Sequence, residues 1–174
     1  EQVVEGRCER CDTPVTQRQL TQWFLRITRY ADELLDFSHG DYSETTQRLQ
    51  RHWIGRREGA EIDFAVVGGN ASPGETITVF STRPDTLYGA TFLVLAPEHP
   101  AALRITDADR ASAVADYIEQ TATRSEIDRL AASDVKTGVD TGAEAINPVN
   151  GRRLPVWVAD YVLAGFGSGA IFAT

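Results

Sequence analysis

The sequence predicts an α+β fold, a β-barrel-like and mainly antiparallel domain with peripheral helices. Two observations carry this prediction. Apolar and polar residues alternate after Gly59 and again between Ala143 and the last residue, which is typical of strands. The intervening residues 97–132 have a helical composition. Strands, then a helical excursion, then strands again favour an antiparallel sheet over alternating βα units.

The chain has two cysteines, Cys8 and Cys11, in the spacing C-E-R-C. Such a pair serves as half of a zinc site, as a redox pair or as two free thiols. A redox pair usually opens a helix, whereas the Asp-Thr-Pro at 12–14 is typical of a turn. We therefore favour half of a structural zinc site. Because such a site takes four ligands, the other two are expected outside this chain.

Residues 15–36 change their apolar period midway. A partly buried strand is predicted by the alternating side chains Leu20, Trp23, Leu25 and Ile27. Thr28 is then expected to cap a short helix that runs to Leu35.

A second helix is expected from Glu44 to about Trp53. Ser43 stands at its capping position, because a serine hydroxyl can accept a hydrogen bond from a free amide of the first turn. Gly55 follows the helix and is typical of a helix end. Together with the preceding segment, this helix makes residues 17–58 a connector of strand and helix.

A β-hairpin is predicted directly after Gly59. Residues 62–66 and 77–79 alternate in polarity, and the Gly- and Pro-containing stretch at 68–74 supplies the loop between them. The segment from Ala90 to Leu95 is a largely apolar run of strand length, which predicts a buried strand.

Three helices and three strands are expected in the remainder. The first helix is predicted with Pro100 in its first turn and Ala102 and Leu103 following, and the other two at 111–121 and at 125–132. The strands are predicted at 143–146, 154–158 and 169–174, and the Asn150-Gly151 dipeptide is a signal for a tight hairpin between the first two.

The charge distribution limits the classes of function. The net charge is −8, and residues 59–174 hold eight Lys or Arg against fifteen Asp or Glu. Extensive wrapping of nucleic acid is disfavoured, since it needs many basic contacts to phosphate, whereas a site for the tip of one RNA strand stays open. The sequence has neither an 18-residue apolar run nor a signal-peptide pattern. We therefore expect no membrane contact and a cytoplasmic location.

The run S-T-R-P-D-T-L-Y-G at 81–89 follows the predicted strand that ends at Phe80. Pro84 fixes a turn, and Asp85 can cap a short helix. Four polar side chains would then face one small volume: Ser81, Thr82, Arg83 and Thr86. The run indicates the polar mouth of a pocket; the alternative is a capped turn from strand to helix without a further role.

A second run, D-Y-V-L-A-G-F-G-S-G-A at 160–170, has three glycines within five residues. Glycines let a backbone approach a ligand closely or turn at positive φ. No lysine follows Gly169, and no strand-loop-helix order surrounds the run, so a tight turn into the last strand is favoured over a phosphate-binding loop. No His, Cys or Ser of the chain lies in a recognisable triad or nucleophile-elbow context.

These segments together resemble the editing domain of bacterial leucyl-tRNA synthetases. The run at 81–89 is similar to the threonine-rich T-T-R-P-D-T motif of that family, with Ser81 in place of the first threonine. Further matches are Q-W-F at 22–24, Y-A-D-E-L-L at 30–35, Q-R-H-W-I-G-R at 50–56, G-V-D-T-G at 138–142 and P-V-W-V-A-D-Y at 155–161. Nearly the whole sequence is covered.

The resemblance implies a fold and an activity. The editing insertion of this family is a β-barrel-like α+β domain, joined to a catalytic Rossmann core by two β-strand linkers. It hydrolyses the ester of tRNA-Leu that carries norvaline, isoleucine or a similar amino acid. By this resemblance, residues 1–16 are the end of a zinc-binding module, residues 17–58 a linker segment, and residues 59–174 an editing domain that is C-terminally incomplete. Zinc would be held by a half-site in this chain, and ATP and magnesium only by the full-length enzyme.

The matched motif implies roles for five residues. Thr82 and Arg83 would be the catalytic pair that helps hold the terminal adenosine and the hydrolytic centre. Thr86 would exclude the cognate leucine side chain. Ser81 and Asp85 would complete the substrate-binding turn.

Three further residues match the wall of the family's pocket. Phe166 stands where the family's Y-G-T-G string has tyrosine, so a hydroxyl is missing there. Phe172 and Thr174 stand at positions that are commonly Met and Val. The family continues into a G-H-D-Q-R-D-like stretch, whose aspartate anchors the substrate's α-amino group, and this stretch would follow Thr174.

The family's mechanism needs no nucleophilic side chain. A water attacks the aminoacyl ester, positioned by backbone groups, threonine hydroxyls and the tRNA ribose. A second site is needed because one methylene changes binding in a hydrophobic pocket by only about 1–3 kcal/mol. The expected partners are the 3′ end of tRNA-Leu and a noncognate aminoacyl adenosine, bound by a monomer. The alternatives are a non-catalytic fragment or adaptor and the editing domain of an isoleucyl- or valyl-tRNA synthetase.

Overall fold

The computed structural model describes residues 2–4, 6–15, 21–122, 124, 129 and 136–174. Contacts divide the chain into two compact units, one of Glu1–Gln17 with Gly59–Thr174 and the other of Arg18–Glu58. Within the described ranges, none of the helices combines the length and the apolar character that crossing a bilayer requires.

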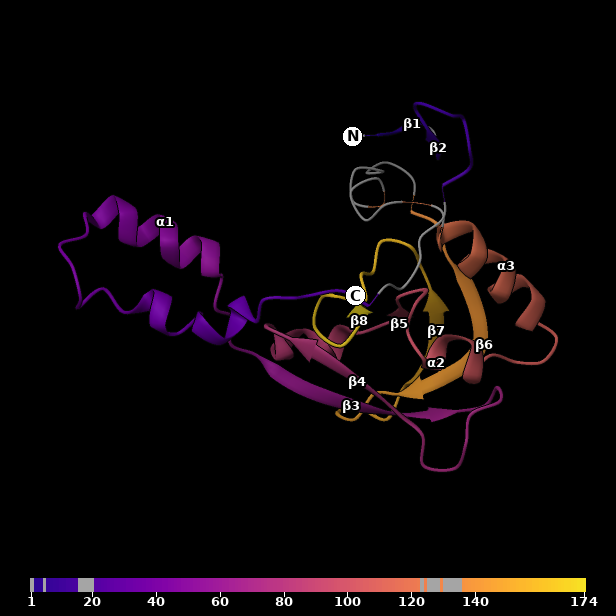
Figure 1. Cartoon of the computed structure of the whole chain (residues 1–174). Helices are drawn as coiled ribbons and strands as arrows, with labels where there is room; N and C mark the ends of the chain where they lie inside the picture. The colour runs from indigo at the N-terminus through magenta and orange to yellow at the C-terminus, as the bar shows by residue number, and fades with distance from the viewer. Residues whose placement is uncertain (1, 5, 16–20, 123, 125–128, 130–135) are drawn as a thin grey trace. The chain divides into compact units, whose positions relative to one another are not determined.

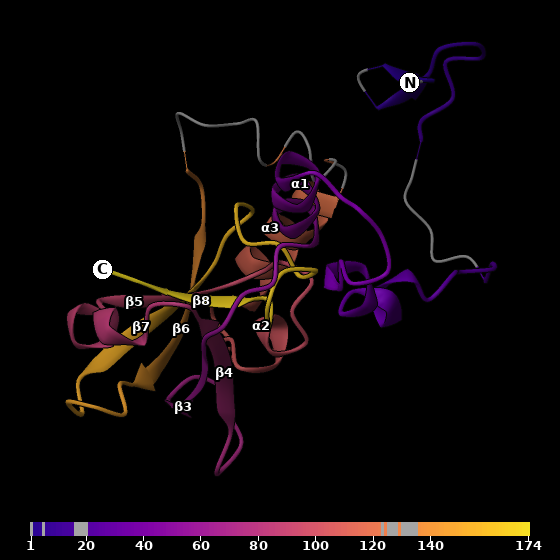
Figure 2. The same ribbon diagram turned by 90° about the vertical axis from the view of Figure 1, so that its left-hand side faces the viewer.

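Six strands form the main sheet of the larger unit, in the order β4-β3-β6-β7-β5-β8. Their bounds are Ala60–Val67 for β3, Thr76–Ser81 for β4, Phe92–Leu95 for β5, Val139–Ile146 for β6, Arg153–Val158 for β7 and Ala170–Ala173 for β8. Only the pairing of β5 with β7 is parallel within this described sheet. The edge strands β4 and β8 lie side by side, so the sheet curls into a nearly closed barrel (Figures 1 and 2). The predicted α+β, barrel-like and mainly antiparallel fold is confirmed.

The core of the barrel follows from the alternation of side chains along its strands. In β7, Leu154, Val156 and Val158 are buried and the residues between them are exposed. Each such burial contributes about 1.5–3 kcal/mol to folding. The last three residues of β5, 93–95, are all buried. A second apolar cluster, which includes Val94 and Val162, explains why β5 has no polar face.

The described elements of the larger unit include the α-helices α2 (Ala101–Arg104) and α3 (Ala111–Ala122). Pro100 is the residue that precedes α2, and α3 packs beside β6 (Figure 1). The helices predicted around Ala102 and at 111–121 are confirmed, although Pro100 is the N-cap of α2 and does not belong to its first turn. The helix predicted at 125–132 lies outside the described residues, with the exception of Arg129.

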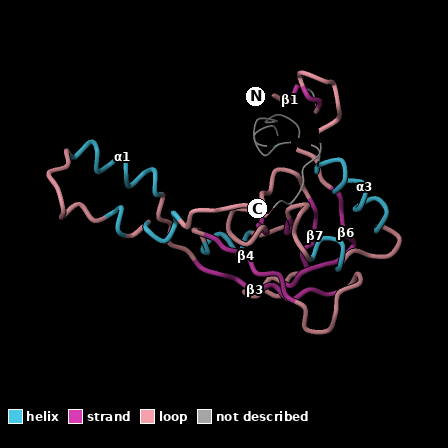
Figure 3. The backbone as a smooth tube through the Cα atoms, in the orientation of Figure 1, coloured by secondary structure: helices cyan, strands magenta, loops and turns pink. Residues whose placement is uncertain are grey.

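The smaller unit consists of α1 (Glu44–Ile54) and two 3-10 helices, η1 (Ile27–Tyr30) and η2 (Glu33–Leu35). Figure 3 shows α1 running beside the shorter helices. As predicted, the Ser43 hydroxyl accepts a hydrogen bond from the Thr46 amide at 3.2 Å, and Gly55 ends the helix at φ 64°.

The strand predicted from the alternation of Leu20, Trp23, Leu25 and Ile27 is wrong for the residues that can be judged. Residues 21–26 have no regular structure, Ile27 opens η1, and Leu20 lies outside the described residues. The Trp23 side chain is fully exposed. An alternating pattern becomes a stable strand only where a neighbouring strand and a core receive it. The helix cap predicted at Thr28 is also wrong, because Thr28 lies inside η1 and Arg26 precedes it.

The remaining elements are short. A two-stranded hairpin pairs β1 (Val3–Val4) with β2 (Arg7–Cys8). A further 3-10 helix, η3 (Pro84–Gly89), joins β4 to β5.

A bulge in β6 requires glycine at position 142. The register shifts between Asp140 and Glu144, and Gly142 has φ 78°. A Cβ atom on Gly142 would lie 2.2 Å from the Asp107 Oδ2 atom. The bulge joins the sheet to the segment after α2, because the Asp107 amide donates to the carbonyl of Thr141 at 2.9 Å.

We expect Gly142→Ala to lower the free energy of unfolding by at least about 2 kcal/mol more than Gly74→Ala does, because overpacking adds to the cost of positive φ. Gly74 is the matched control, since its φ of 79° is nearly the same and a Cβ atom there meets nothing within 4 Å. Urea denaturation of the two variants measures the difference. Equal losses would contradict the close approach of Asp107.

Candidate functional site

The turn that leaves β4 is held by hydrogen bonds to the main chain of Arg83. The Ser81 hydroxyl accepts from the Arg83 amide at 3.1 Å. The Thr86 hydroxyl donates to the Arg83 carbonyl at 2.8 Å, and the Thr86 amide donates to the same oxygen at 3.1 Å. Two of the predicted hydroxyls therefore converge on one residue and fix its backbone. Thr82 lies between them and is exposed.

The Arg83 guanidinium binds the Asp85 carboxylate in a two-pronged ion pair. Nε donates to Oδ1 at 2.9 Å, and Nη2 donates to Oδ2 at 2.7 Å. Asp85 was expected to cap the following helix, but this is wrong: Arg83 is the N-cap residue of η3, and Asp85 lies inside the helix, where its carboxylate binds the guanidinium. The hydrogen bonds from Arg83, and secondarily its charge, lower the pKa of Asp85. The arrangement holds a planar cation at a largely exposed position.

The carbonyl groups of η3 are anchored by two asparagines of the β6–β7 turn. Asn147 is fully buried; its Nδ2 donates to the carbonyl of Leu87 at 2.8 Å, and its Oδ1 accepts from the Val149 amide at 3.1 Å. Asn150 donates to the carbonyl of Tyr88 at 3.3 Å. From the sequence, Asn150 was predicted only as part of a hairpin signal, and no role was predicted for Asn147. The presence of a second asparagine beside the Asn150-Gly151 dipeptide was the sequence signal that could have indicated this contact.

The end of the chain lies beside η3. A Cβ atom on Gly89 would be 3.4 Å from the Thr174 Cγ2 atom. Phe172 pairs across the sheet with Leu93, and its ring centroid is 6.2 Å from that of Phe64. Thr174 is thus next to the predicted turn, whereas Phe172 is half-buried and packs against the core cluster.

The loop that carries Phe166 reaches the same region. Phe166 is 81% exposed, and a Cβ atom on Gly167 would lie 3.6 Å from the Cβ atom of Phe80, the residue before Ser81. Gly167 and Gly169 have positive φ, at 60° and 71°. The prediction of a tight turn into the last strand is confirmed. Segments that are distant in the sequence therefore meet at the edges of β4 and β8.

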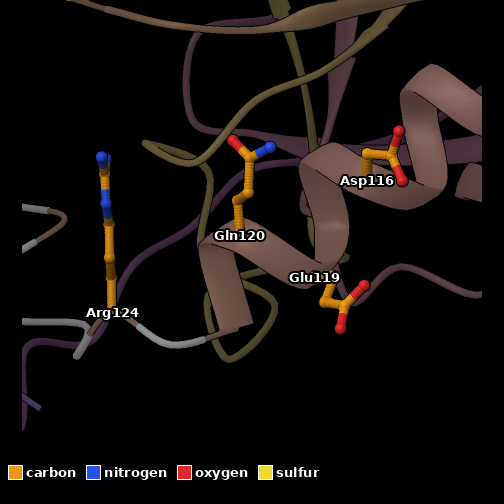
Figure 4. A pocket seen from close by; sticks show the side chains of 4 residues that line it. All are labelled: Asp116, Glu119, Gln120 and Arg124. Carbon is orange, nitrogen blue, oxygen red and sulfur yellow. The ribbon is translucent and has the colours of Figure 1, made fainter.

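A shallow hollow on α3 is a different feature. Its volume is about 530 Å³, and it is lined by Asp116, Glu119, Gln120 and Arg124 (Figure 4). Gln120 and Arg124 extend in the same direction, while Glu119 points the other way. Arg124 also donates to the Asp160 carboxylate at 3.1 Å. The lining includes none of the sequence-predicted site residues, so the hollow gives no support to the predicted chemistry.

The two cysteines are free thiols on a turn. The Cys8 amide donates to the carbonyl of Thr13 at 3.0 Å, and Asp12 has φ 55°. The Cys11 sulfur lies 3.2 Å from the Thr13 hydroxyl, and hydrogen bonds from Thr13 and then from the Cys8 side chain lower the pKa of the Cys11 thiol. Thiolate is the metal-binding form. Across the part of the chain that is described, no group of three or more His, Cys, Asp or Glu residues gathers to hold a metal.

Comparison with known families gives a match over most of the chain. The family model of the leucyl-tRNA synthetase editing domain matches residues 51–174. The turn at 81–86, the glycine-rich loop and Thr174 all lie within the matched segment.

Individual relatives agree with the family match. The leucine–tRNA ligase of Rubrobacter xylanophilus is 58% identical over 175 residues, and that of Herpetosiphon aurantiacus is 53% identical over 177 residues. Each alignment covers 99% of this chain and 21% of the relative, so the chain spans about a fifth of the length of these relatives. The isoleucyl or valyl alternative is not favoured by these matches.

A solved structure is similar as well. It is the ternary complex of the Agrobacterium radiobacter K84 agnB2 LeuRS with tRNA and LeuAMS, with a TM-score of 0.73 and 39% identity. The similarity covers 99% of this chain and 21% of that one.

We expect an NMR titration of the chain to show a pKa for Asp85 below its ordinary value of 3.8, and Arg83→Gln to return it toward that value. Because the folded-state pKa is lowered, the stabilisation is present above 3.8 and is lost as the pH falls through the lowered value. Asp36 is the internal control. Its pKa is lowered mainly by the Ser38 backbone amide, so Arg83→Gln should leave the Asp36 pKa unchanged. If the Asp85 pKa is unchanged in Arg83→Gln, the ion pair is refuted.

Proposed function

The chain belongs to the leucyl-tRNA synthetase editing-domain family, and from this premise we propose that it is the hydrolytic module that removes a wrong amino acid from tRNA-Leu. The observation that carries the proposal is the turn at 81–86, where the family's threonine-rich motif leaves an edge strand with the main chain of Arg83 fixed from both sides. A fixed turn presents its groups without reorganisation during the reaction.

The reaction proposed is hydrolysis of the aminoacyl ester at the 3′ end of tRNA-Leu. Water adds to the ester carbonyl carbon, negative charge develops on the carbonyl oxygen, and the bond to the ribose oxygen breaks with return of a proton to that oxygen. Thr82 and Arg83 hold the terminal adenosine and the hydrolytic centre. The Arg83 guanidinium suits this role, because it is held as a fixed cation close to the surface.

Thr86 is proposed to reject the cognate amino acid. Its hydroxyl is bound to the Arg83 carbonyl, which fixes the side-chain torsion, and a β-branched side chain then holds its methyl group in one direction. Such a wall discriminates by repulsion, which is how a second site gains selectivity. Substrate contacts are proposed for five further residues: Ser81, Asp85, Phe166, Phe172 and Thr174.

The proposed partner is tRNA-Leu. Only its 3′ end, the terminal adenosine that carries a noncognate amino acid, enters the site. A contact limited to the strand's tip agrees with the acidic charge of residues 59–174. Ligation of leucine to tRNA with ATP and magnesium is proposed for the complete synthetase, a cytoplasmic monomer.

We further propose that Cys8 and Cys11 supply two thiolates of a structural zinc site whose remaining ligands lie outside this chain. The turn that carries both thiols supports this, because the Asp12 amide donates to the Cys8 carbonyl at 2.9 Å and the Cys11 side chain is exposed.

The function can be tested by grafting this chain into the Rubrobacter xylanophilus synthetase in place of the corresponding segment, and measuring release of isoleucine from Ile-tRNA-Leu. The intact graft should deacylate this substrate, and Arg83→Gln should slow it by about 100-fold or more, the cost of losing one stabilising donor. The matched control is Arg153→Gln, which removes an exposed Arg153–Glu144 ion pair on β7. An inactive graft beside an active parent would overturn the proposal.

The role of Thr86 has its own test in the same graft. We expect Thr86→Ala to release leucine from correctly charged Leu-tRNA-Leu at least about tenfold faster, because the excluding methyl is removed. Thr86→Val keeps the branched bulk and should keep the exclusion. If Thr86→Ala spares Leu-tRNA-Leu while the graft clears Ile-tRNA-Leu, Thr86 is not the excluding residue.

A further inference from the structure

Arg129 is a charged residue that the proposed chemistry does not use, yet its side chain is only 4% exposed. A buried cation needs several partners to offset its lost hydration. The guanidinium has three: Nε donates to the carbonyl of Asp160 at 2.6 Å, Nη2 to the carbonyl of Val162 at 2.8 Å, and Nη1 to the carboxylate of Glu98 at 2.6 Å.

Two of these partners lie at the start of one loop, and the third lies on a segment that contacts its end. We define the glycine loop as residues 160–169, which carry Phe166 between β7 and β8. Asp160 and Val162 begin it. Glu98 belongs to the segment after β5, and this segment holds the loop's end, since the Ala96 amide donates to the Gly169 carbonyl at 2.8 Å. One guanidinium therefore binds the start of the glycine loop and the segment that holds its end.

The base of the loop is fixed further by other segments, whereas the described hydrogen bonds of its tip are local: the Phe166 amide donates to the Leu163 carbonyl and the Gly169 amide to the Phe166 carbonyl, both at 3.2 Å. The Asp160 amide donates to the Tyr117 hydroxyl, and Arg124 donates to the Asp160 carboxylate, both at 3.1 Å. By contrast, residues 164–167 are all exposed. A Cβ atom on Gly165 would meet nothing within 4 Å. Since the tip has little packing of its own, its position depends on how its base is held.

We propose that Arg129 is a positioning residue for editing. It holds the glycine loop in the conformation in which Gly167 packs on Phe80, next to the turn at 81–86, so that a wall for the tRNA 3′ end is ordered before binding. This inference rests on the proposed function. Arg129 touches the loop's main chain, and the loop, in turn, is the part that meets the substrate.

A lysine at position 129 cannot make the same three contacts. The guanidinium presents donors in one rigid plane, here to two carbonyl oxygens and one carboxylate, whereas an ammonium is a single point charge on a flexible stem. With lysine, at least one of these carbonyls would lose its donor, and a buried carbonyl without a donor favours local opening.

The first test needs no substrate. In hydrogen–deuterium exchange of the chain, Arg129→Lys should speed exchange of the hydrogen-bonded loop amides of Phe166 and Gly169 by about tenfold or more, because local opening breaks those hydrogen bonds. The matched control is Arg110→Lys, which alters the part-buried Arg110–Asp140 pair between the start of α3 and β6. Glu98→Gln keeps an acceptor and should give a smaller increase, and it serves if Arg129→Lys does not fold. Exchange of the Phe166 and Gly169 amides that is unchanged in both Arg129→Lys and Glu98→Gln, or equally fast in Arg110→Lys, would overturn the proposal.

The second test measures deacylation of Ile-tRNA-Leu by the graft. A loop that must be ordered during binding raises KM, so Arg129→Lys should raise KM by about tenfold and leave kcat within about twofold. A merely structural role would lower kcat through loss of folded enzyme at unchanged KM, and this outcome would refute positioning. If the intact graft releases no isoleucine, the proposed function fails, while the exchange experiment still decides whether Arg129 holds the loop.

Discussion

The closure of the six-stranded sheet is the constraint on which the candidate site depends. Its edge strands β4 and β8 lie side by side although they are not neighbours in the hydrogen-bonded order. Because the turn at 81–86 leaves one edge and the glycine loop enters the other, closure brings both to one place. The parallel pairing of β5 with β7 makes this possible, since it puts β5 between β7 and β8. An open sheet of the same strands would keep these segments apart.

The site is stiff because main-chain groups are satisfied by side chains from distant segments. Ser81 and Thr86 bind the backbone of Arg83, and Asn147 holds a carbonyl of η3. A hydrolytic site without a nucleophilic side chain needs such stiffness, because its contribution is the placement of water, ester and charge. The proposed clamp by Arg129 extends the same principle to the glycine loop. The chemistry proposed would thus depend on fixed acceptors and donors more than on any reactive group.

Local signals predicted most of the fold, and long-range contacts account for what they missed. The hairpin at 60–81, the capped helix after Ser43 and the turn at Asn150-Gly151 are encoded by neighbouring residues, so they could be predicted. The strand through Trp23 could not be judged from its alternation, since a strand also needs a partner. Asn147 and Arg129 bind segments far away in the sequence. The identity of an asparagine or an arginine does not indicate which distant segment it will contact. The pairing of Asp85 with Arg83 is local, but capping and ion pairing compete for one carboxylate.

The acidic charge of the larger unit and its proposed RNA substrate are compatible because of where the cations are placed. Of the described arginines in this unit, Arg129 and Arg124 are committed to Glu98 and Asp160 within the protein. Arg83 is paired too, yet its pair lies at the surface, where a phosphate can share the guanidinium. A surrounding negative field would weaken the attraction of the protein for the body of a tRNA, while exposed guanidinium groups such as that of Arg83 at the turn would still attract a phosphate. Charge would then act with the shape of the turn to admit the end of one strand.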